Sequence, residues 1–81
     1  MTDLFETEAV RDRAAVVETL ERTARQLEDG VLHLRGRSRE HRISVPERTH
    51  MELELEREPT DDGIAYELEI EITWTDSAPR E

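Results

Sequence analysis

The stretch that decides the predicted fold is YELEIEITW, residues 66–74. Apolar and acidic residues alternate along it, and this period of two is that of a β-strand with one buried and one wet face. Residues 49–58, THMELELERE, alternate in the same way, and the turn-forming residues PTDDG lie between the two stretches. We therefore expect an antiparallel hairpin with one apolar face and one face of glutamates.

Upstream of this hairpin the apolar residues follow the spacing of three and four that indicates a helix. The residues on its apolar face are Val16 or Val17, then Leu20, Ala24 and Leu27. Asp12 is the expected N-cap, because a short acceptor side chain can bind free N–H groups at a helix start. Gly30 is the expected C′ residue, where a left-handed backbone costs glycine little.

The remaining stretches with a period of two predict the other strands. They are residues 4–9 (LFETEA), 31–35 (VLHLR) and 41–45 (HRISV). The predicted fold class is α+β, with the order β-α-β-β-β-β and a single amphipathic helix packed on one face of a four- or five-stranded antiparallel meander sheet. We expect residues 1–81 to form a single domain with an ordered core from about residue 3 to residue 76.

The composition is strongly acidic. Asp and Glu number 21 against 11 basic residues, every one of which is arginine, and the formal net charge is −10. Such a charge repels nucleic acid and anionic membranes, so neither is an expected partner. A glutamate-rich chain without lysine resembles proteins of the haloarchaeal cytosol, and screening in molar salt makes dense carboxylates tolerable. Simple solubility is the alternative explanation.

Cysteine is absent, so no disulfide or thiolate metal site is possible. The first residues, MTDLFETEAV, have acidic side chains where a signal peptide would be basic, and no apolar run is long enough to cross a membrane. We expect a soluble, cytoplasmic protein without a cofactor.

Three features together resemble the amphi-Trp domain family. They are the LFE-type start with the helix ending RQLEDG, the two glutamate-alternating strands, and the tryptophan Trp74 that follows them. The resemblance covers about residues 3–76, and it departs at Thr73, where an acidic residue is usual before the tryptophan. The resemblance implies a family name and no activity.

The glutamate face offers three interpretations. Paired carboxylates can act as acid and base, but such chemistry needs a pocket that raises one pKa, and these residues alternate along exposed strands. Carboxylates can also bind Ca²⁺ or Mg²⁺, although a flat ladder has no loop to wrap an ion. A hydrated face without bound ligand is favoured, so we expect no enzyme, no catalytic residue and no metal site.

We take as a trial register of this hairpin the one in which Leu55 lies opposite Tyr66. Glu54 then lies opposite Glu67, and Glu52 lies opposite Glu69. Like charges directly opposite each other are destabilising, so the protein is expected to gain stability with salt. On the same meander His50 lies beside Glu71 and Arg42 faces Glu52.

Histidines and arginines give weaker signals. His33 and His50 point to the wet face two strands apart, about 9.6 Å, which is too far for one zinc ion. The residues Arg35, Arg37, Arg39 and Arg42 form a basic corner that either balances the glutamates or docks an acidic partner or anion. GRSRE lacks the glycine spacing of a phosphate loop, and no motif positions a Ser/His/Asp set.

The apolar face of the sheet is larger than one helix can cover. A helix of about 17 residues is about 25 Å long, whereas the last strands run over about 30 Å in a sheet some 19–24 Å wide. Either the sheet curls strongly or part of this face is left for a partner. The second option predicts a homodimer or a protein partner, at an interface formed by Leu55, Ile64, Tyr66 or Trp74. The predicted function is a small acidic interaction module. The alternative is a small-ligand or divalent-cation binder that uses the apolar cleft or the glutamate ladder.

Overall fold

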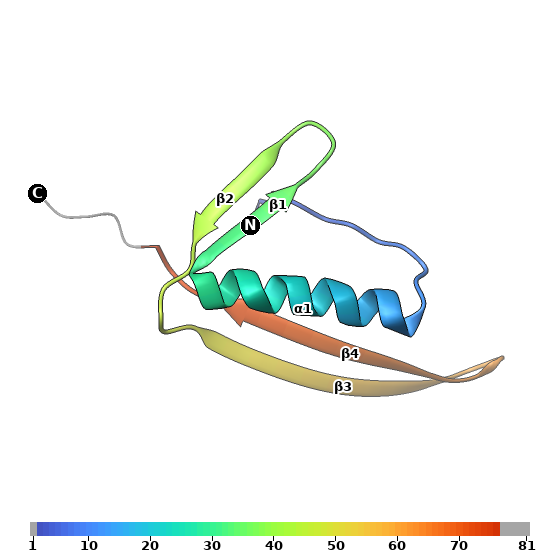
Figure 1. The fold of residues 1–81 in the computed structure, drawn as a ribbon. Coiled ribbons are helices and arrows are strands. Elements are labelled where there is room, and N and C mark those ends of the chain that lie inside the picture. Colours follow the sequence, from blue (N-terminus) through green and yellow to red (C-terminus); the bar gives the residue numbers. More distant parts are fainter. Residues whose placement is uncertain (1, 77–81) are drawn as a thin grey trace, which may run out of the picture. The chain divides into compact units, whose positions relative to one another are not determined.

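The computed structural model describes residues 2–76 and has the element order α-β-β-β-β (Figure 1). Helix α1 spans Arg13–Asp29, and the strands are β1 (Val31–Arg35), β2 (Glu40–Ser44), β3 (His50–Thr60) and β4 (Gly63–Thr73). The chain divides into two compact units, Met1–Glu47 and Arg48–Glu81. The predicted α+β class is confirmed.

Both predicted ends of the helix are confirmed. The Asp12 side chain accepts a hydrogen bond of 2.9 Å from the Ala15 backbone N–H, which satisfies one of the free donors of the first turn. Gly30 has φ 80°, in the left-handed region, and its N–H bonds the carbonyl oxygens of Gln26 and Leu27. A Cβ in this conformation is costly, which explains the glycine that follows the helix.

The single meander sheet is not confirmed. The described strands form two separate two-stranded antiparallel sheets, β1–β2 and β3–β4. The chain leaves β2 at Ser44 and reaches β3 at His50 through a link that contains Pro46, a residue without an N–H for a strand ladder. The Val45 N–H at the start of this link instead bonds the Gly30 carbonyl oxygen at 2.8 Å.

The first predicted strand is wrong. The structure assigns no strand to residues 4–9, because no strand of the described chain pairs with them. Phe5 instead lies near the β1–β2 turn, 3.9 Å from the position of a Cβ added to Gly36. A short, loosely alternating stretch becomes a strand only where a partner edge is available.

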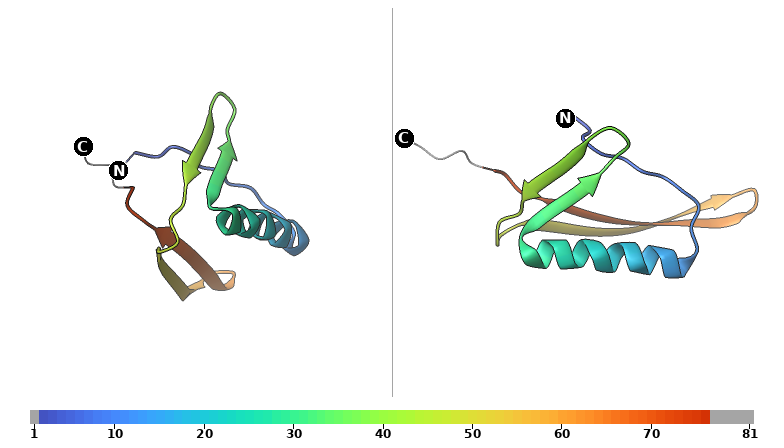
Figure 2. Two further views of the ribbon diagram at one scale, coloured as in Figure 1. Left: turned by 60° about the vertical axis from the view of Figure 1, so that its left-hand side comes forward. Right: turned by 45° about the horizontal axis from the view of Figure 1, so that its top comes forward.

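The β3–β4 hairpin is the longest element pair, with 11 residues in each strand (Figure 2). Its turn is formed by Asp61 and Asp62 alone, because Thr60 and Gly63 already pair. The Thr60 hydroxyl donates to the Gly63 carbonyl oxygen at 2.7 Å and accepts from the Asp62 N–H at 3.3 Å. Turn length fixes the register of a hairpin, so the two-residue turn determines which side chains meet.

The observed register differs from the predicted one by two residues. Leu55 pairs with Leu68, and Tyr66 pairs with Arg57. The prediction placed the whole PTDDG segment in the turn, whereas Pro59 and Thr60 belong to β3. Because the shift is even, each side chain keeps its predicted face, and only its partner across the hairpin changes.

Candidate protein-contact face

The apolar strip is one face of the β3–β4 hairpin. It consists of five cross-strand pairs, namely Met51–Ile72, Leu53–Ile70, Leu55–Leu68, Arg57–Tyr66 and Pro59–Ile64. Alternation with a period of two in both strands places these residues on one side. The Leu55–Leu68 pair is the middle of the five.

The large side chains of the apolar strip are widely exposed. Seven of them are exposed by fractions from 44% at Ile70 to 70% at Leu55, and Ile72 is half-buried. No residue in the described range 2–76 is fully buried. A two-stranded hairpin is marginally stable alone, and exposed apolar surface of this extent marks a contact surface or an aggregation hazard.

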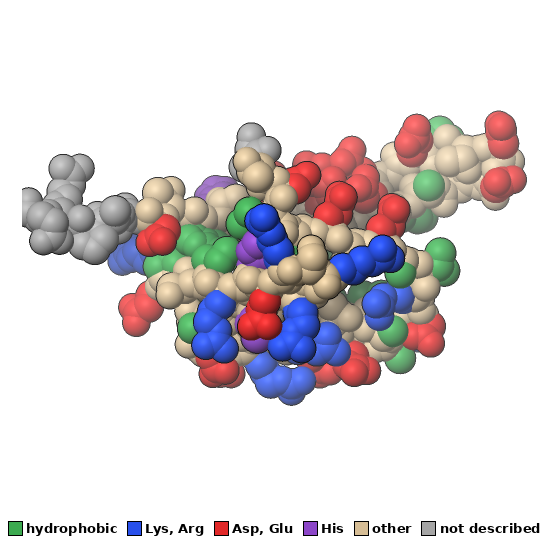
Figure 3. All heavy atoms as spheres, turned by 90° about the horizontal axis from the view of Figure 1, so that it is seen from above, with side chains coloured by type: hydrophobic (Ala, Val, Ile, Leu, Met, Phe, Trp, Pro, Cys, Tyr) green, Lys and Arg blue, Asp and Glu red, His purple; other side chains and the backbone are tan. Residues whose placement is uncertain are grey.

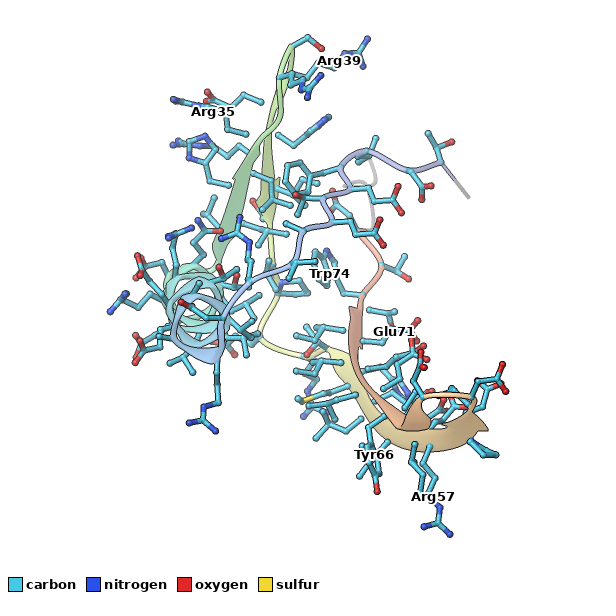
Figure 4. The ribbon with its side chains drawn as sticks, turned by 90° about the vertical axis from the view of Figure 1, so that its right-hand side faces the viewer. Arg35, Arg39, Arg57, Tyr66, Glu71 and Trp74 are labelled. Carbon is cyan, nitrogen blue, oxygen red and sulfur yellow. The ribbon has the colours of Figure 1, made fainter. Side chains whose placement is uncertain are left out.

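Three of the four predicted interface residues lie on the apolar strip. Leu55, Ile64 and Tyr66 are 70%, 55% and 66% exposed. Figure 4 shows Tyr66 projecting from the same face of the hairpin as Arg57, and away from Glu71. Trp74 follows the last residue of β4 and is half-buried. It lines a shallow hollow of about 380 Å³ together with Arg48, Thr49, His50, Thr73 and Thr75.

Arg57 is the one charged residue of the apolar strip and was not singled out from the sequence. It pairs directly with Tyr66. The sequence could have placed Arg57 on this face, because position 57 continues the series 51, 53 and 55, whose residues are all apolar. An arginine there can lay its apolar stem on the strip while its guanidinium group reaches solvent.

The glutamate ladder is the opposite face of the same hairpin. Its cross-strand pairs are Glu52–Glu71, Glu54–Glu69 and Glu56–Glu67. The trial register gave two like-charged pairs, and the observed register gives three with different partners. Glu58 lies opposite Ala65 and so has no charge directly across the hairpin.

Mutual repulsion within the glutamate ladder raises two pKa values. The pKa of Glu54 is raised by its hydrogen bond and charge interaction with Glu56, and further by the charge of Glu69. The pKa of Glu69 is raised first by the charge of Glu67. One carboxylate oxygen from each of Glu54, Glu56 and Glu69 lies within 4.8 Å of the others. These three residues are the part of the ladder best placed to share a cation.

The predicted neighbour of His50 is wrong. His50 pairs with Thr73, because the register is shifted, and its Nε2 atom lies 3.9 Å from Glu52 Oε1 on its own strand. His33 belongs to the other unit and has a different carboxylate, Glu40 Oε1, 2.9 Å from its Nε2 atom. These two histidines thus have separate acidic neighbours.

A polar cluster joins helix α1 to the β1–β2 hairpin. The Gln26 side chain accepts from the His33 N–H at 3.0 Å and donates to the His33 carbonyl oxygen at 3.1 Å. Glu40 Oε2 lies 3.1 Å from Arg35 on the paired strand. The His33 imidazole, with Arg35 beside it, lowers the pKa of Glu40. The role of Gln26 was not predicted, because a glutamine in a helix gives no pattern that names its partner.

The predicted basic corner lies on and around the β1–β2 hairpin. Arg42 pairs with His33 on β1, so the predicted Arg42–Glu52 pairing is wrong. Figure 4 shows Arg35 and Arg39 projecting from the far part of this hairpin. In Figure 3 acidic side chains, and no arginine, are visible on the end of the β3–β4 hairpin, while arginines gather elsewhere on the same view. Residues 35–42 contain four arginines and one glutamate, whereas β3 and β4 contain seven glutamates and one arginine, Arg57. Positive and negative charge are thus concentrated on different hairpins.

Comparison with known proteins identifies the fold family. The model of the Amphi-Trp domain family matches residues 1–81, which confirms and extends the predicted resemblance. No curated protein and no solved structure matches. No helix among residues 2–76 is long and apolar enough to cross a membrane.

Proposed function

The chain belongs to the Amphi-Trp domain family, and we propose that it is a protein-interaction module whose contact surface is the apolar strip. The observation that carries the proposal is the exposure of seven large apolar side chains on one face of β3–β4. Water on such a surface is costly at about 25 cal/mol per Å², so a complementary protein surface gains free energy by covering it.

The arrangement of charge supports this use of the two faces. The glutamate ladder is on the side opposite the apolar strip, so a partner can cover the strip without desolvating carboxylates. We propose that the carboxylates keep the free protein soluble despite its exposed strip, in a cytoplasm of high salt concentration. The proposal assigns the chain no catalytic activity.

The proposal can be tested with the chain immobilised by a terminal tag. Protein retained from a lysate at native salt concentration, including further copies of the chain, is measured for the natural chain, Leu55→Asp and Glu54→Gln. Leu55→Asp places a charge in the middle of the strip, so we expect it to lose most of the retained protein. Glu54→Gln changes the opposite face of the same strand and should retain as much as the natural chain. Equal retention by all three chains, with circular dichroism showing that all are folded, contradicts the proposal.

Cation binding is a second candidate function, favoured by the close approach of Glu54, Glu56 and Glu69. Hard cations such as Ca²⁺ take several oxygen ligands, and a bound cation relieves the repulsion that raises the pKa of Glu54 and Glu69. A titration with Ca²⁺, Mg²⁺ and Zn²⁺ that follows NMR shifts of these residues and Trp74 fluorescence tests it. Saturable shifts that vanish in Glu54→Gln support the candidate, and unchanged spectra exclude it. A small apolar ligand on the strip is tested with the same readouts.

A further inference from the structure

The apolar strip has the properties of a surface that pairs with a copy of itself. Building on the proposed function, we infer that its occupant is a second copy of this chain, packed face to face about a two-fold axis through the middle of the strip. A two-fold interface brings the same patch of both partners together, so the patch must be complementary to itself. An aliphatic ladder that also contains Tyr66, Pro59 and a single charged residue, Arg57, meets this condition.

The size of the strip fits a stable dimer. Seven large apolar side chains, each 44–70% exposed, line it. At roughly 100 Å² of exposed surface per side chain, the strip offers about 700 Å² per copy and about 1,400 Å² in a pair, within the range of about 1,200–2,000 Å² for specific interfaces.

Stacking also explains how so long a hairpin is stabilised. Two sheets packed face to face lie about 10 Å apart and bury both inner faces. The result is a four-stranded, two-layer core in place of two isolated ribbons, which are marginal alone. Both glutamate ladders remain in water on the outer sides, so the contact brings no carboxylate of one copy against a carboxylate of the other.

The two-fold axis fixes which residues meet. Whether the strands of the two copies run parallel or antiparallel, an axis through the middle of the strip brings the Leu55–Leu68 pair against the same pair of the other copy. Arg57 lies one pair away from this centre, where its stem can cross the strip and its guanidinium group can reach the rim.

Chemical cross-linking tests this arrangement, because the chain contains no cysteine. Leu55→Cys and Glu54→Cys introduce single thiols at neighbouring positions on opposite faces of β3. Both are treated at molar salt with a bis-maleimide whose flexible arm is about 10 Å, long enough to join thiols on the inner faces of sheets whose backbones are about 10 Å apart. Molar mass is measured by sedimentation in parallel. We expect a dimer mass and at least tenfold more cross-linked dimer for Leu55→Cys than for Glu54→Cys.

Leu68→Cys, at the other side of the central pair, repeats the test if Leu55→Cys alters the mass. A dimer that cross-links better through position 54 overturns the face-to-face arrangement. A monomer mass contradicts the inference that a second copy covers the strip. In that case a further measurement tests the proposed function: the rate at which a reagent with one maleimide labels the thiol of Leu55→Cys. Labelling as fast as in the unfolded chain leaves the strip open to another protein. Labelling at least tenfold slower means that the chain covers the strip itself, and the proposed function is then wrong as well.

Discussion

At the scale of single residues, the carboxylates of the glutamate ladder repel one another. Glu54 and Glu69 lie opposite each other, and their neighbours Glu56 and Glu67 raise the pKa of each. An acid whose pKa is raised on folding destabilises the folded state at any pH above that pKa. Lowering the pH toward the raised pKa values therefore relieves the repulsion. This direction is opposite to that of ordinary ion-paired carboxylates.

The pKa of Glu40 is shifted in the opposite direction, downward. Its pKa is lowered by the His33 imidazole and by Arg35, so its ionised form stabilises the fold. That contribution is complete above the ordinary pKa of a glutamate and is lost as the pH falls through the lowered pKa. We therefore expect stability to rise as the pH falls from 7 through the raised pKa values of the ladder, and to fall again at more acidic pH.

The double change Glu54→Gln with Glu69→Gln should raise the melting temperature at pH 7 and low salt. Glutamine keeps the size and removes both raised-pKa carboxylates, so the repulsion they share disappears. Thermal melts followed by circular dichroism measure the effect, which should shrink in molar salt and at acidic pH. Glu58→Gln is the matched control, because Glu58 faces Ala65 and should change little. An equal gain in the control would contradict the assignment to the ladder.

At the scale of elements, two local interactions position the helix and the strands. Gln26 connects helix α1 to β1 through both backbone groups of His33. The Asp61–Asp62 turn, closed by the Thr60 hydroxyl, sets the register of the β3–β4 hairpin. Neither interaction contributes a large apolar area. The Gln26 bonds satisfy two backbone groups of β1, and the turn decides which apolar residues of β3 and β4 meet.

Replacing Gln26 with alanine should destabilise the unit Met1–Glu47 by about 1–3 kcal/mol, because it leaves the half-buried His33 N–H and carbonyl oxygen without their partner. The free energy of unfolding from denaturant titration measures the loss. Arg25→Ala, one exposed position earlier in α1, should stay within about 0.5 kcal/mol of the natural chain. Equal effects of the two changes would mean that the Gln26 bonds carry no stability.

Gly63→Ala should weaken the β3–β4 hairpin by about 1–3 kcal/mol, because Gly63 has φ 133°, a conformation that residues with a Cβ rarely adopt. An added Cβ meets no atom within 4 Å, so the cost comes from the backbone alone. Gly36→Ala is the control, since its Cβ would make an ordinary contact of 3.5 Å with the Arg39 carbonyl oxygen and its φ is not positive. Amide hydrogen exchange across β3 and β4 reports the difference.

At the scale of the whole molecule, a net charge of −10 acts on a fold without a fully buried residue in its described part. Screening shortens the reach of the carboxylates from about 10 Å at 0.1 M salt to about 3 Å at 1 M. We therefore expect salt to favour the folded chain and the proposed contact between copies. Assembly and folding are expected to be linked, because whatever covers the strip binds only the folded hairpin.

The natural chain should melt at a higher temperature in molar KCl than at 0.1 M, by several degrees. It should also show a larger mass in sedimentation at molar salt. Repeating the melts at several protein concentrations separates the two effects, since only assembly makes the melting temperature depend on concentration. A melting temperature that does not change between the two salt concentrations would refute the repulsive ladder.

Several features followed from the sequence with their physical cause. Asp12 and Gly30 mark the helix ends because capping chemistry is local. The alternation in β3 and β4 determined which residues share the apolar strip and which share the glutamate ladder, because successive side chains of a strand point to opposite faces. The family resemblance followed from the same pattern with Trp74.

Tertiary structure alone decided the partners of these residues. The pairing of Leu55 with Leu68 depends on a two-residue turn, which the PTDDG segment does not distinguish from a longer one. The split into two sheets and the absence of a strand at residues 4–9 depend on which edges pair, a choice made between distant segments. Alternation is a property of one strand and is visible in its sequence, whereas register and pairing belong to two strands and exist only after they meet.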